Sequence, residues 1–214
     1  MPIVVDRIVL NPQYGSNCYV LRAADGAAEA AIVDPGGEPG PLREALNRMG
    51  AAAGGILITH CDVDHVTGVA GLAAGTGAEV WAPAGEADAL RRGETRGGMQ
   101  VDAHEPEHVV EGGERLTVAG IDFEVVAVPG HSAGHVAFCV EDMVFSGDLL
   151  FAGSVGRVDF PGGDWEALLD SIRGLIERFG PDAVVHPGHG GPTTLGRELE
   201  TNPFLGELRR PTSA

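Results

Sequence analysis

The stretch that most constrains this chain is Thr59-His60-Cys61-Asp62-Val63-Asp64-His65, which carries two imidazoles and two carboxylates within six residues. We refer to it as loop 59–65. The run before it, 55–58, is short and apolar, which is typical of a buried strand. The residues after it, 66–74, are small and apolar and favour a closely packed helix. Because functional sites are usually built where strands end in layered α/β folds, loop 59–65 predicts a site on a strand–turn–helix unit.

One interpretation of loop 59–65 requires no site, because an aspartate at a helix N-terminus can simply cap the helix. A metal site would need further ligands from elsewhere in the chain. Three other apolar strands end in glycine-containing turns that present His or Asp, and these turns carry His131, His135, Asp148, His186 and His189. Four strand endings of one pattern exceed what helix capping explains, so the sequence predicts a metal site.

The charge of the chain excludes some classes of partner. The 214 residues have a formal net charge of −17, and all 14 basic residues are arginines. Nucleic acids and anionic membranes bind basic surfaces, so neither is expected as a partner. The first residues lack the basic and apolar regions of a signal peptide, and no apolar run approaches the roughly 20 residues that span a bilayer. Cys18, Cys61 and Cys139 form no CxxC pair and are expected to be reduced thiols, so the sequence predicts a cytoplasmic protein.

The order of strand and helix patterns predicts one α/β (α+β) domain over residues 1–214. Both halves contain apolar runs separated by short polar turns, which indicates largely antiparallel strands. The two similar halves predict a four-layer αββα sandwich, in which two mostly antiparallel sheets face each other, helices cover the outside, and the metal ligands lie along one edge. The clearest helix is 164–179, with Asp164 as a natural N-cap. The expected strands are 3–10, 17–22, 30–34, 55–58, 78–81, 108–110, 115–118, 121–128, 136–140, 143–145 and 183–186, and the other expected helices are 41–49, 66–74, 85–92 and 195–200.

Some segments and side chains are expected to lie outside the site or to cover it. Residues 93–106, rich in Gly, Arg and Glu, predict a mobile flap over the site. His104 and His108 are expected to be exposed surface histidines. If loop 59–65 is locally extended, the side chain of Cys61 points away from its neighbours. The tail, 209–214, is expected to fray.

These residues resemble the pattern of the metallo-β-lactamase-fold hydrolases, whose signature is His-x-His-x-Asp-His followed by a distant His, Asp and His. Within that superfamily the chain is most similar to the short glyoxalase II-like (hydroxyacylglutathione hydrolase-like) proteins. The resemblance runs nearly end to end, and its segments are 17–21, 34–36, 59–65, 129–131, 147–151, 153–157, 187–190 and 202–205.

The resemblance implies two divalent metal ions and the side chains that hold them. Site one would consist of His60, residue 62, His131 and Asp148, and site two of Asp64, His65, Asp148 and His189. Imidazole and carboxylate ligands suit Zn, Fe or Mn, and the shared Asp148 would let two cations lie close together. A hydroxide between them would be a nucleophile at neutral pH. Asp64 is also expected to be a catalytic residue.

Further residues are implied around these ligands. Asp34 and His135 would orient the ligating imidazoles, although His135 could equally be a satisfied core histidine. His186 is expected to be structural. Arg157 would help to hold an anionic substrate, or would form a structural salt bridge instead.

The sequence departs from the family pattern at Asp62, where the signature has a second His. A carboxylate there would favour iron or manganese over zinc and would make the hydroxide less acidic. Flavodiiron proteins resemble this chain in placing a carboxylate, Glu, at the same position, but the rest of their pattern is absent. Three outcomes stay open: a dinuclear site with an altered metal preference, a single metal held mainly at site two, or a chain that has lost hydrolysis.

The resemblance implies a hydrolase that cleaves a small acyl thioester such as S-lactoyl-glutathione with a metal-bound hydroxide. The chain shows no counterpart of the C-terminal helical domain that supplies basic side chains to the thiol in full-length glyoxalase II, so the carrier thiol is left open, as is dimerisation. The alternatives are a persulfide dioxygenase with one iron and a degenerate, non-catalytic metal-binding member of the family. β-Lactamase activity is not expected, because such enzymes place Cys or a small polar residue where this chain has Asp148, and the acidic charge disfavours a nuclease.

Overall fold

The interior contains separate hydrophobic layers on the two faces of each sheet. Successive residues of a strand point to opposite faces, so one strand contributes to two layers. The computed structural model describes residues 2–209. In β2 (Ser16–Arg22), Cys18 and Val20 pack towards helices, whereas Tyr19 and Leu21 pack between the two sheets. A third cluster of buried residues lies on the outer face of the second sheet. Three apolar layers between four layers of secondary structure confirm the αββα sandwich.

The first sheet is mixed. Its antiparallel part is β1–β2–β3, and its remaining strands pair in parallel. Parallel neighbours need crossover connections, and short helices supply them. The sheet is therefore more parallel than the sequence predicted, because the strands from β3 onward are followed by helices rather than by tight turns. The strands in order are β1 (Val4–Asn11), β2, β3 (Glu29–Val33), β4 (Ala52–Leu57), β5 (Val80–Pro83) and β6 (His108–Val110), and the helices are α1 (Pro39–Met49), α2 (Val63–Val66), α3 (Val69–Thr76) and α4 (Ala87–Arg92).

The second sheet is mostly antiparallel, as expected. Only β10 and β13 pair in parallel, and the connection between them contains α5 (Trp165–Phe179). The order is β14 (Thr193–Thr194), β13 (Val184–Pro187), β10 (Met143–Gly147), β9 (Val136–Val140), β8 (Ile121–Ala127) and β7 (Arg115–Val118). The short pair β11 (Leu150–Phe151) and β12 (Ser154–Val155), together with β14 and the 3-10 helix Pro203–Leu205, had no clear sequence signal.

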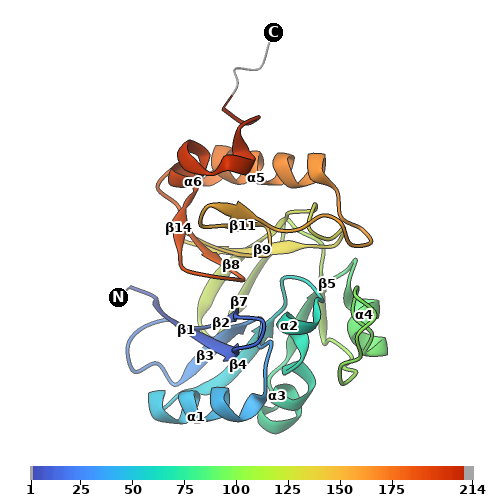
Figure 1. Cartoon of the computed structure of the whole chain (residues 1–214). Helices are drawn as coiled ribbons and strands as arrows, with labels where there is room; N and C mark the ends of the chain where they lie inside the picture. The colour runs from blue at the N-terminus through green and yellow to red at the C-terminus, as the bar shows by residue number, and fades with distance from the viewer. Residues whose placement is uncertain (1, 210–214) are drawn as a thin grey trace.

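Helices cover both outer faces of the sandwich. Figure 1 shows α1 and α3 beneath the first sheet, and α5 and α6 (Leu195–Thr201) above the second. Helix α5 begins as predicted, because the Asp164 side chain accepts a hydrogen bond from the backbone of Ala167 at 2.9 Å. Its apolar stripe, formed by Leu168, Leu169, Ile172 and Leu175, is buried against the sheet.

The helix expected over 66–74 is two helices, α2 and α3, separated by Gly68. A Cβ atom at Gly68 would lie 2.2 Å from the Gly37 carbonyl oxygen, so the chain turns here against the loop after β3. This turn lets α2 begin inside loop 59–65 and brings Asp64 and His65 to the edge of the sheet.

Segment 93–106, which the sequence predicts to be a flap over the site, makes backbone hydrogen bonds within itself. Glu94 and Gln100 form an antiparallel bridge, and the Val101 amide donates to the Gly93 carbonyl at 2.9 Å. Of the tail that was expected to fray, residues 210–214 lie outside the described residues. Within the described part of the chain, no helix combines the length and the apolar character needed to cross a membrane.

Candidate metal centre

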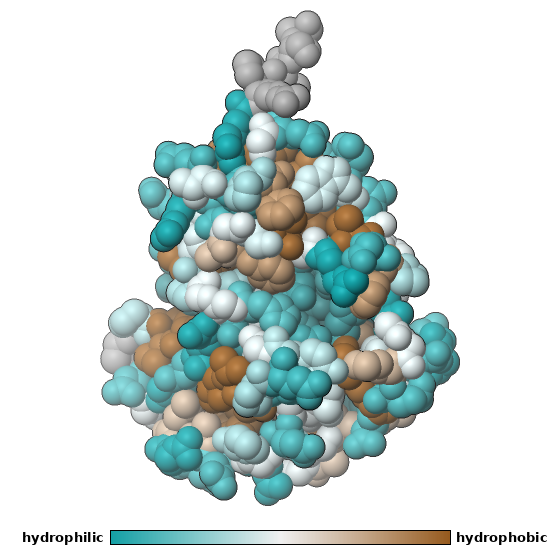
Figure 2. Space-filling model, in the orientation of Figure 1, coloured by the Kyte–Doolittle hydropathy of each residue, from teal (hydrophilic) through white to brown (hydrophobic). Residues whose placement is uncertain are grey.

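Four strand endings meet at one edge of the sandwich. Backbone hydrogen bonds join the two sheets there: the Val136 amide donates to Thr59 O at 3.0 Å, and the Asn17 amide donates to Gly188 O at 2.7 Å. The turns after β4, β8, β10 and β13 are thereby held together, as the sequence predicted. Figure 2 shows hydrophilic side chains across the recessed middle of this face, with hydrophobic patches above and below.

The carboxylates of loop 59–65 do not serve as helix caps. Asp62 occupies the N-cap position of α2, but its side chain accepts no capping hydrogen bond. Cys61 is buried in the core beneath the first sheet, so its thiol points away from the site. The side chains of His60 and His65 lie together, with their ring centroids 4.3 Å apart. The helix-cap interpretation is therefore wrong for Asp62, and the loop faces its polar side chains into a common space.

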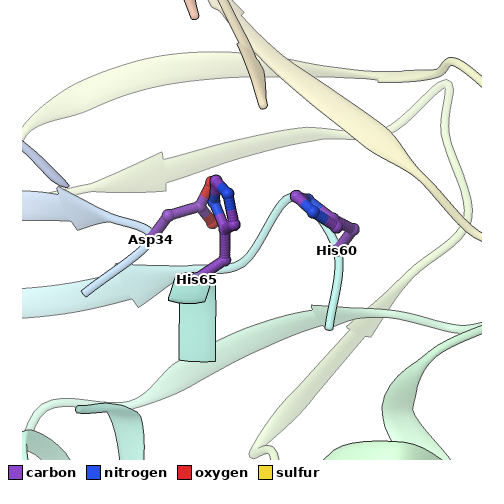
Figure 3. Close-up of side chains that lie close together, drawn as sticks. All are labelled: Asp34, His60 and His65. Atoms are coloured by element: carbon purple, nitrogen blue, oxygen red, sulfur yellow. The ribbon is translucent and has the colours of Figure 1, made fainter. Parts of the chain in front are cut away.

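Asp34 orients two of the imidazoles. Its Oδ2 accepts the Thr59 hydroxyl at 2.6 Å and lies 3.1 Å from His65 Nδ1 (Figure 3). Because the Thr59 hydroxyl proton is given to Asp34, Thr59 Oγ1 accepts from His60 Nδ1 at 3.0 Å. When His60 and His65 are neutral, the proton of each ring is therefore on Nδ1, and the lone pair of Nε2 faces the site.

The same tautomer follows for His131. Its Nδ1 lies 2.8 Å from the backbone carbonyl oxygen of Arg157, which can only accept a hydrogen bond. Nδ1 therefore carries the proton, and Nε2 presents a lone pair towards Asp62 and Asp148, whose Oδ2 atoms are 3.1 and 3.9 Å away. Three ligating imidazoles thus share one orientation, which is the orientation a metal ligand needs.

Several buried atoms at the centre lack the hydrogen bonds that burial demands. His60 Nε2, His65 Nε2 and Asp148 Oδ1 have no hydrogen-bond partner among residues 2–209. Leaving such an atom unpaired costs about 1–3 kcal/mol, so three in one place indicate that something else satisfies them. In the described chain, three sets of side chains have the spacing to hold a metal ion: Asp34, His60 and His65; His60, His131 and Asp148; and Asp64, His65 and His189. In the first set Asp34 already pairs with His65 Nδ1, so the other two sets are the candidate sites. The donor set, imidazole and carboxylate, suits a divalent transition metal.

Asp148 lies between these two sets. Its Oδ1 is 3.3 Å from His65 Nε2, and its Oδ2 is 3.4 Å from His189 Nε2. Burial raises the pKa of Asp148, but the charge of His65 and the close approach of His189 and His65 outweigh burial and hold the pKa well below its usual value. Asp148 is therefore an anion at neutral pH and can serve both sets.

The imidazoles differ in charge. Burial and the three neighbouring imidazoles hold the pKa of His60 well below its usual value, so His60 is neutral, the form that binds a metal. For His189, burial lowers the pKa, but the hydrogen bonds that its ring donates to Asp148 and Asp64 outweigh burial and raise the pKa to about 9. A metal ion that binds His189 would displace that proton.

Arg96 is at the centre as well, which the sequence did not predict. Its guanidinium donates to both carboxylate oxygens of Asp62, at 2.9 and 2.5 Å, and Nη2 lies 2.8 Å from His131 Nε2. Burial raises the pKa of Asp62, but the contact with His131 and the hydrogen bonds from Arg96 outweigh burial and hold that pKa well below its usual value. Asp62 is therefore an anion paired with Arg96. Arg96 is the single arginine of segment 93–106, and its distance along the chain from loop 59–65 carries no information about contact.

The other candidate histidines lie away from the ligands or make no polar contact with them. His135 packs against His60, with ring centroids 4.8 Å apart, but neither of its ring nitrogens has a hydrogen-bond partner among residues 2–209. Burial lowers the pKa of His135 to about 3. His108 stacks on Trp81 at the far end of the first sheet, and His104 lies near Glu107.

Glu86 is a buried acid at the site that sequence reasoning missed. It accepts the Cys61 amide at 2.6 Å and the hydroxyl of Ser132. Burial, the largest influence, raises the pKa of Glu86 above its usual value. Glu86 thus ties loop 59–65 to the turn that carries His131.

Replacing Asp34 with Asn is expected to weaken metal binding by about 10- to 100-fold. Asn has one oxygen, so it cannot accept the Thr59 amide at one position and the Thr59 hydroxyl and His65 at the other, as the two oxygens of Asp34 do. Asn suits this position, because the backbone φ of Asp34 is 50° and Asn tolerates that region. Metal dissociation constants, measured by competition with a chromophoric chelator, provide the test. The exposed Asp182→Asn variant is the control, and equal constants for the two variants would contradict the role given to Asp34.

His186 stacks on Phe145 at a ring-centroid distance of 4.7 Å, outside the metal centre, as the sequence predicted for a structural histidine. Burial lowers its pKa from 6.5 to about 4. The unfolded chain therefore binds more protons between pH 6.5 and 4, so His186 destabilises the fold as the pH falls through that window. The His186→Phe variant should lose part of this acid sensitivity in urea unfolding at pH 7 and about pH 4.5. Parallel pH profiles for wild type and variant would contradict this account.

Comparison with known proteins agrees with this geometry. The model of the metallo-beta-lactamase superfamily matches residues 11–189. The hydroxyacylglutathione hydrolase GloC of Haemophilus influenzae is 36% identical over 201 residues, which cover 90% of this chain and 93% of that protein. The crystal structure of BLEG-1 B3 metallo-beta-lactamase is 34% identical with a TM-score of 0.87, and covers 95% of this chain and 100% of its own. The crystal structure of TTHA1623 in a di-iron-bound form is 38% identical with a TM-score of 0.82. The match covers 94% of this chain and 100% of that chain. Since the superfamily model matches most of the chain and a relative is similar over nearly its whole length, this chain belongs to the metallo-beta-lactamase superfamily of metallo-hydrolases.

Proposed function

We propose that this protein is a metal-dependent hydrolase of small acyl thioesters, similar in activity to glyoxalase II. The observation that carries the proposal is the set of imidazole and carboxylate groups that converge on the floor of one pocket. The pocket has a volume of about 370 Å³ and opens directly onto Asp64, Asp148 and His189. A volume of this size suits a small substrate rather than a polymer.

The walls of the pocket suit an acyl thioester. Its apolar lining comes from Tyr14, Val63, Met99 and Phe160, which can hold a short acyl chain and exclude water around it. The polar lining includes the candidate ligands Asp62, Asp64, His131, Asp148 and His189. A substrate lying along the apolar wall would therefore present its carbonyl carbon to the metal centre.

Arg157 offers a contact for an anionic carrier thiol. Its side chain is 55% exposed and pairs with Asp159 through two contacts of 2.7 Å. The guanidinium lies over the Phe160 ring, 3.9 Å from the ring centroid, at the wall of the pocket. An ion pair exposed to solvent contributes little to stability, so a substrate carboxylate can replace Asp159 at small cost.

The side chains available to a metal are His60, Asp62, His131 and Asp148 at site one, and Asp64, His65, Asp148 and His189 at site two. Arg96 contacts two of the site-one side chains and none of those at site two. When bound, a metal of this kind supplies a nucleophile from water at neutral pH and polarises the substrate carbonyl. The chain's own part is to fix the ligand tautomers through Asp34, Thr59 and the Arg157 carbonyl, and to orient the acyl group. Asp64 lines the pocket together with Asp148 and His189.

Relatives support this proposal without deciding the substrate. GloC, a hydroxyacylglutathione hydrolase, is similar over nearly the whole length of this chain, and a structural neighbour was solved with two irons. A second function, persulfide oxidation, has one observation in its favour: His60, His131 and Asp148 form the two-His, one-carboxylate set that suits non-haem iron. Arg96 contacts His131 Nε2, which places this alternative second.

The test is hydrolysis of a panel of thioesters by protein loaded separately with Zn²⁺, Mn²⁺ or Fe²⁺. The panel includes S-lactoyl-glutathione and an acyl thioester of a thiol that lacks the carboxylates of glutathione. Comparing their rates distinguishes recognition of the acyl group from recognition of the carrier thiol. Parallel assays with a chromogenic β-lactam, and of oxygen uptake with glutathione persulfide, cover the other activities on this fold. Turnover of at least one thioester with metal, and none without, is expected. Oxygen uptake without thioester hydrolysis would favour the dioxygenase, and inactivity with every metal would overturn the proposal.

A further inference from the structure

Arg96 lies where the superfamily signature would place a metal ion. Site one comprises His60, Asp62, His131 and Asp148, and the Arg96 guanidinium contacts two of these four side chains. Its Nη1 also donates to the His131 backbone carbonyl. Among residues 2–209, no arginine contacts Asp64, His65 or His189. The two halves of the centre therefore differ: one contains a built-in cation and the other does not.

The local geometry needs a positive charge between Asp62 and His131. The Nε2 lone pair of His131 lies 3.1 Å from Asp62 Oδ2, and without a donor or a cation two acceptors at that distance would repel. Arg96 Nη2 donates to both atoms. A guanidinium pairs with a carboxylate in a planar, two-bond arrangement, which the Nε and Nη2 contacts to Asp62 reproduce. An imidazole at position 62 could not form this pair.

The backbone holds Arg96 in place. Thr95 and Met99 close a tight turn, in which the Thr95 amide donates to Met99 O at 2.9 Å. At the base of the segment, the His104 amide donates to Leu90 O at 3.0 Å. The Arg96 side chain is only 9% exposed and lies beneath Phe160, whose ring centroid is 5.4 Å from the guanidinium carbon. Arg96 is thus a fixed, desolvated cation and not an exposed side chain that reaches the site by chance.

We propose that Arg96 takes the place of the metal ion at site one, so that the protein binds a single metal, held at site two by Asp64, His65, Asp148 and His189. Asp62 fixes the guanidinium, and the guanidinium excludes a second cation by like-charge repulsion and by occupying the Nε2 lone pair of His131. Arg96 is a positioning residue in this account: it keeps Asp62 and His131 in place and balances their charge. The inference rests on the proposed metallo-hydrolase function and specifies how many metals that function uses.

The experiment is a metal titration of chelator-treated protein. Zn²⁺ or Mn²⁺ is added in steps, unbound metal is removed by desalting, and bound metal is counted by elemental analysis. Wild type is compared with Arg96→Gln, with the double variant Asp62→His/Arg96→Gln, and with Arg173→Gln. Arg173 is the matched control, because it is a half-exposed arginine that pairs with Asp170 on helix α5, away from the site. Mn²⁺-loaded samples are also examined by electron paramagnetic resonance.

Wild type and Arg173→Gln are expected to bind about one metal ion per chain, and both Arg96 variants about two, since removing the guanidinium frees site one. The Mn²⁺ spectrum should change from that of an isolated ion to that of a coupled pair, because Asp148 would bridge the two sites. About two ions in the wild type, or about one in the Arg96 variants, would overturn the proposal. If Arg96→Gln does not fold, the numbers of metal ions bound by the double variant and by the wild type test the proposal. One ion bound without thioester hydrolysis would overturn only the proposed function, whereas two ions with hydrolysis would overturn only this inference.

Discussion

Replacing Asp148 with Asn is expected to reduce kcat/KM for thioester hydrolysis by about 10³-fold and to reduce the bound metal in the same preparation. Asp148 is the only carboxylate within about 4 Å of imidazoles from both candidate sites in the described chain, at 3.3 Å from His65 and 3.9 Å from His131. Asn keeps the shape but removes the negative charge, so the ligand set loses its shared anion. Steady-state kinetics and elemental analysis on one sample measure both effects.

The control for this substitution is Asp182→Asn, which changes the same chemical group on the exposed surface. It should retain the wild-type metal content and rate. If Asp148→Asn kept its metal and lost less than about tenfold in kcat/KM, Asp148 would not be a ligand, and the account of the centre would be wrong.

Replacing Gly188 with Ala is expected to cost about 10²-fold in kcat/KM, because displacing a ligand by about 1 Å has effects of this size. A Cβ atom at Gly188 would lie 2.1 Å from Asp148 Oδ1 and 2.7 Å from the His65 ring. Both contacts are far inside van der Waals distance, so Asp148 or the turn after β13 must move. The metal content should fall with the rate.

Gly191→Ala is the matched control, since a Cβ atom there would meet nothing within 4 Å. Both variants should unfold cooperatively, and only Gly188→Ala should lose metal and activity. Equal rates for the two variants would show that the turn after β13 can adjust without disturbing Asp148.

Much of the fold could be predicted because the sequence carries local signals of it. The continuous apolar run of β2 and the capped, periodic helix α5 are both explicit in the sequence. Whether neighbouring strands are parallel or antiparallel was harder to predict. The parallel pairings of β3 to β6 depend on how short helices such as α4 pack, and no local sequence pattern indicates that packing. The two-residue strands β11, β12 and β14 are too short to show a period.

The candidate centre could be assembled from sequence because its side chains follow strand endings in a repeated pattern. Asp34 was expected near the ligands, and the structure places it against His65. Arg96 could not be found in this way. It reaches Asp62 from 34 residues further along the chain, on a turn that is fixed by backbone hydrogen bonds rather than by a motif. Long-range pairing of this kind is visible only in the folded chain.

The contact between Asp62 and Arg96 changes the interpretation of position 62. From the sequence, Asp62 was a departure from the signature with three open outcomes. The structure pairs it with Arg96, which favours the outcome in which one metal is held at site two. Asp62 and Arg96 together then act as one unit that replaces a metal and its ligand.

The measurement that most directly tests metal-dependent hydrolysis is the rate of thioester cleavage by chelator-treated protein as metal is returned in known amounts. The account predicts no turnover without metal, a rate that rises in proportion to added metal, and a plateau at about one ion per chain. Turnover that persists after the metal is removed, or that is absent at every metal concentration, would contradict it.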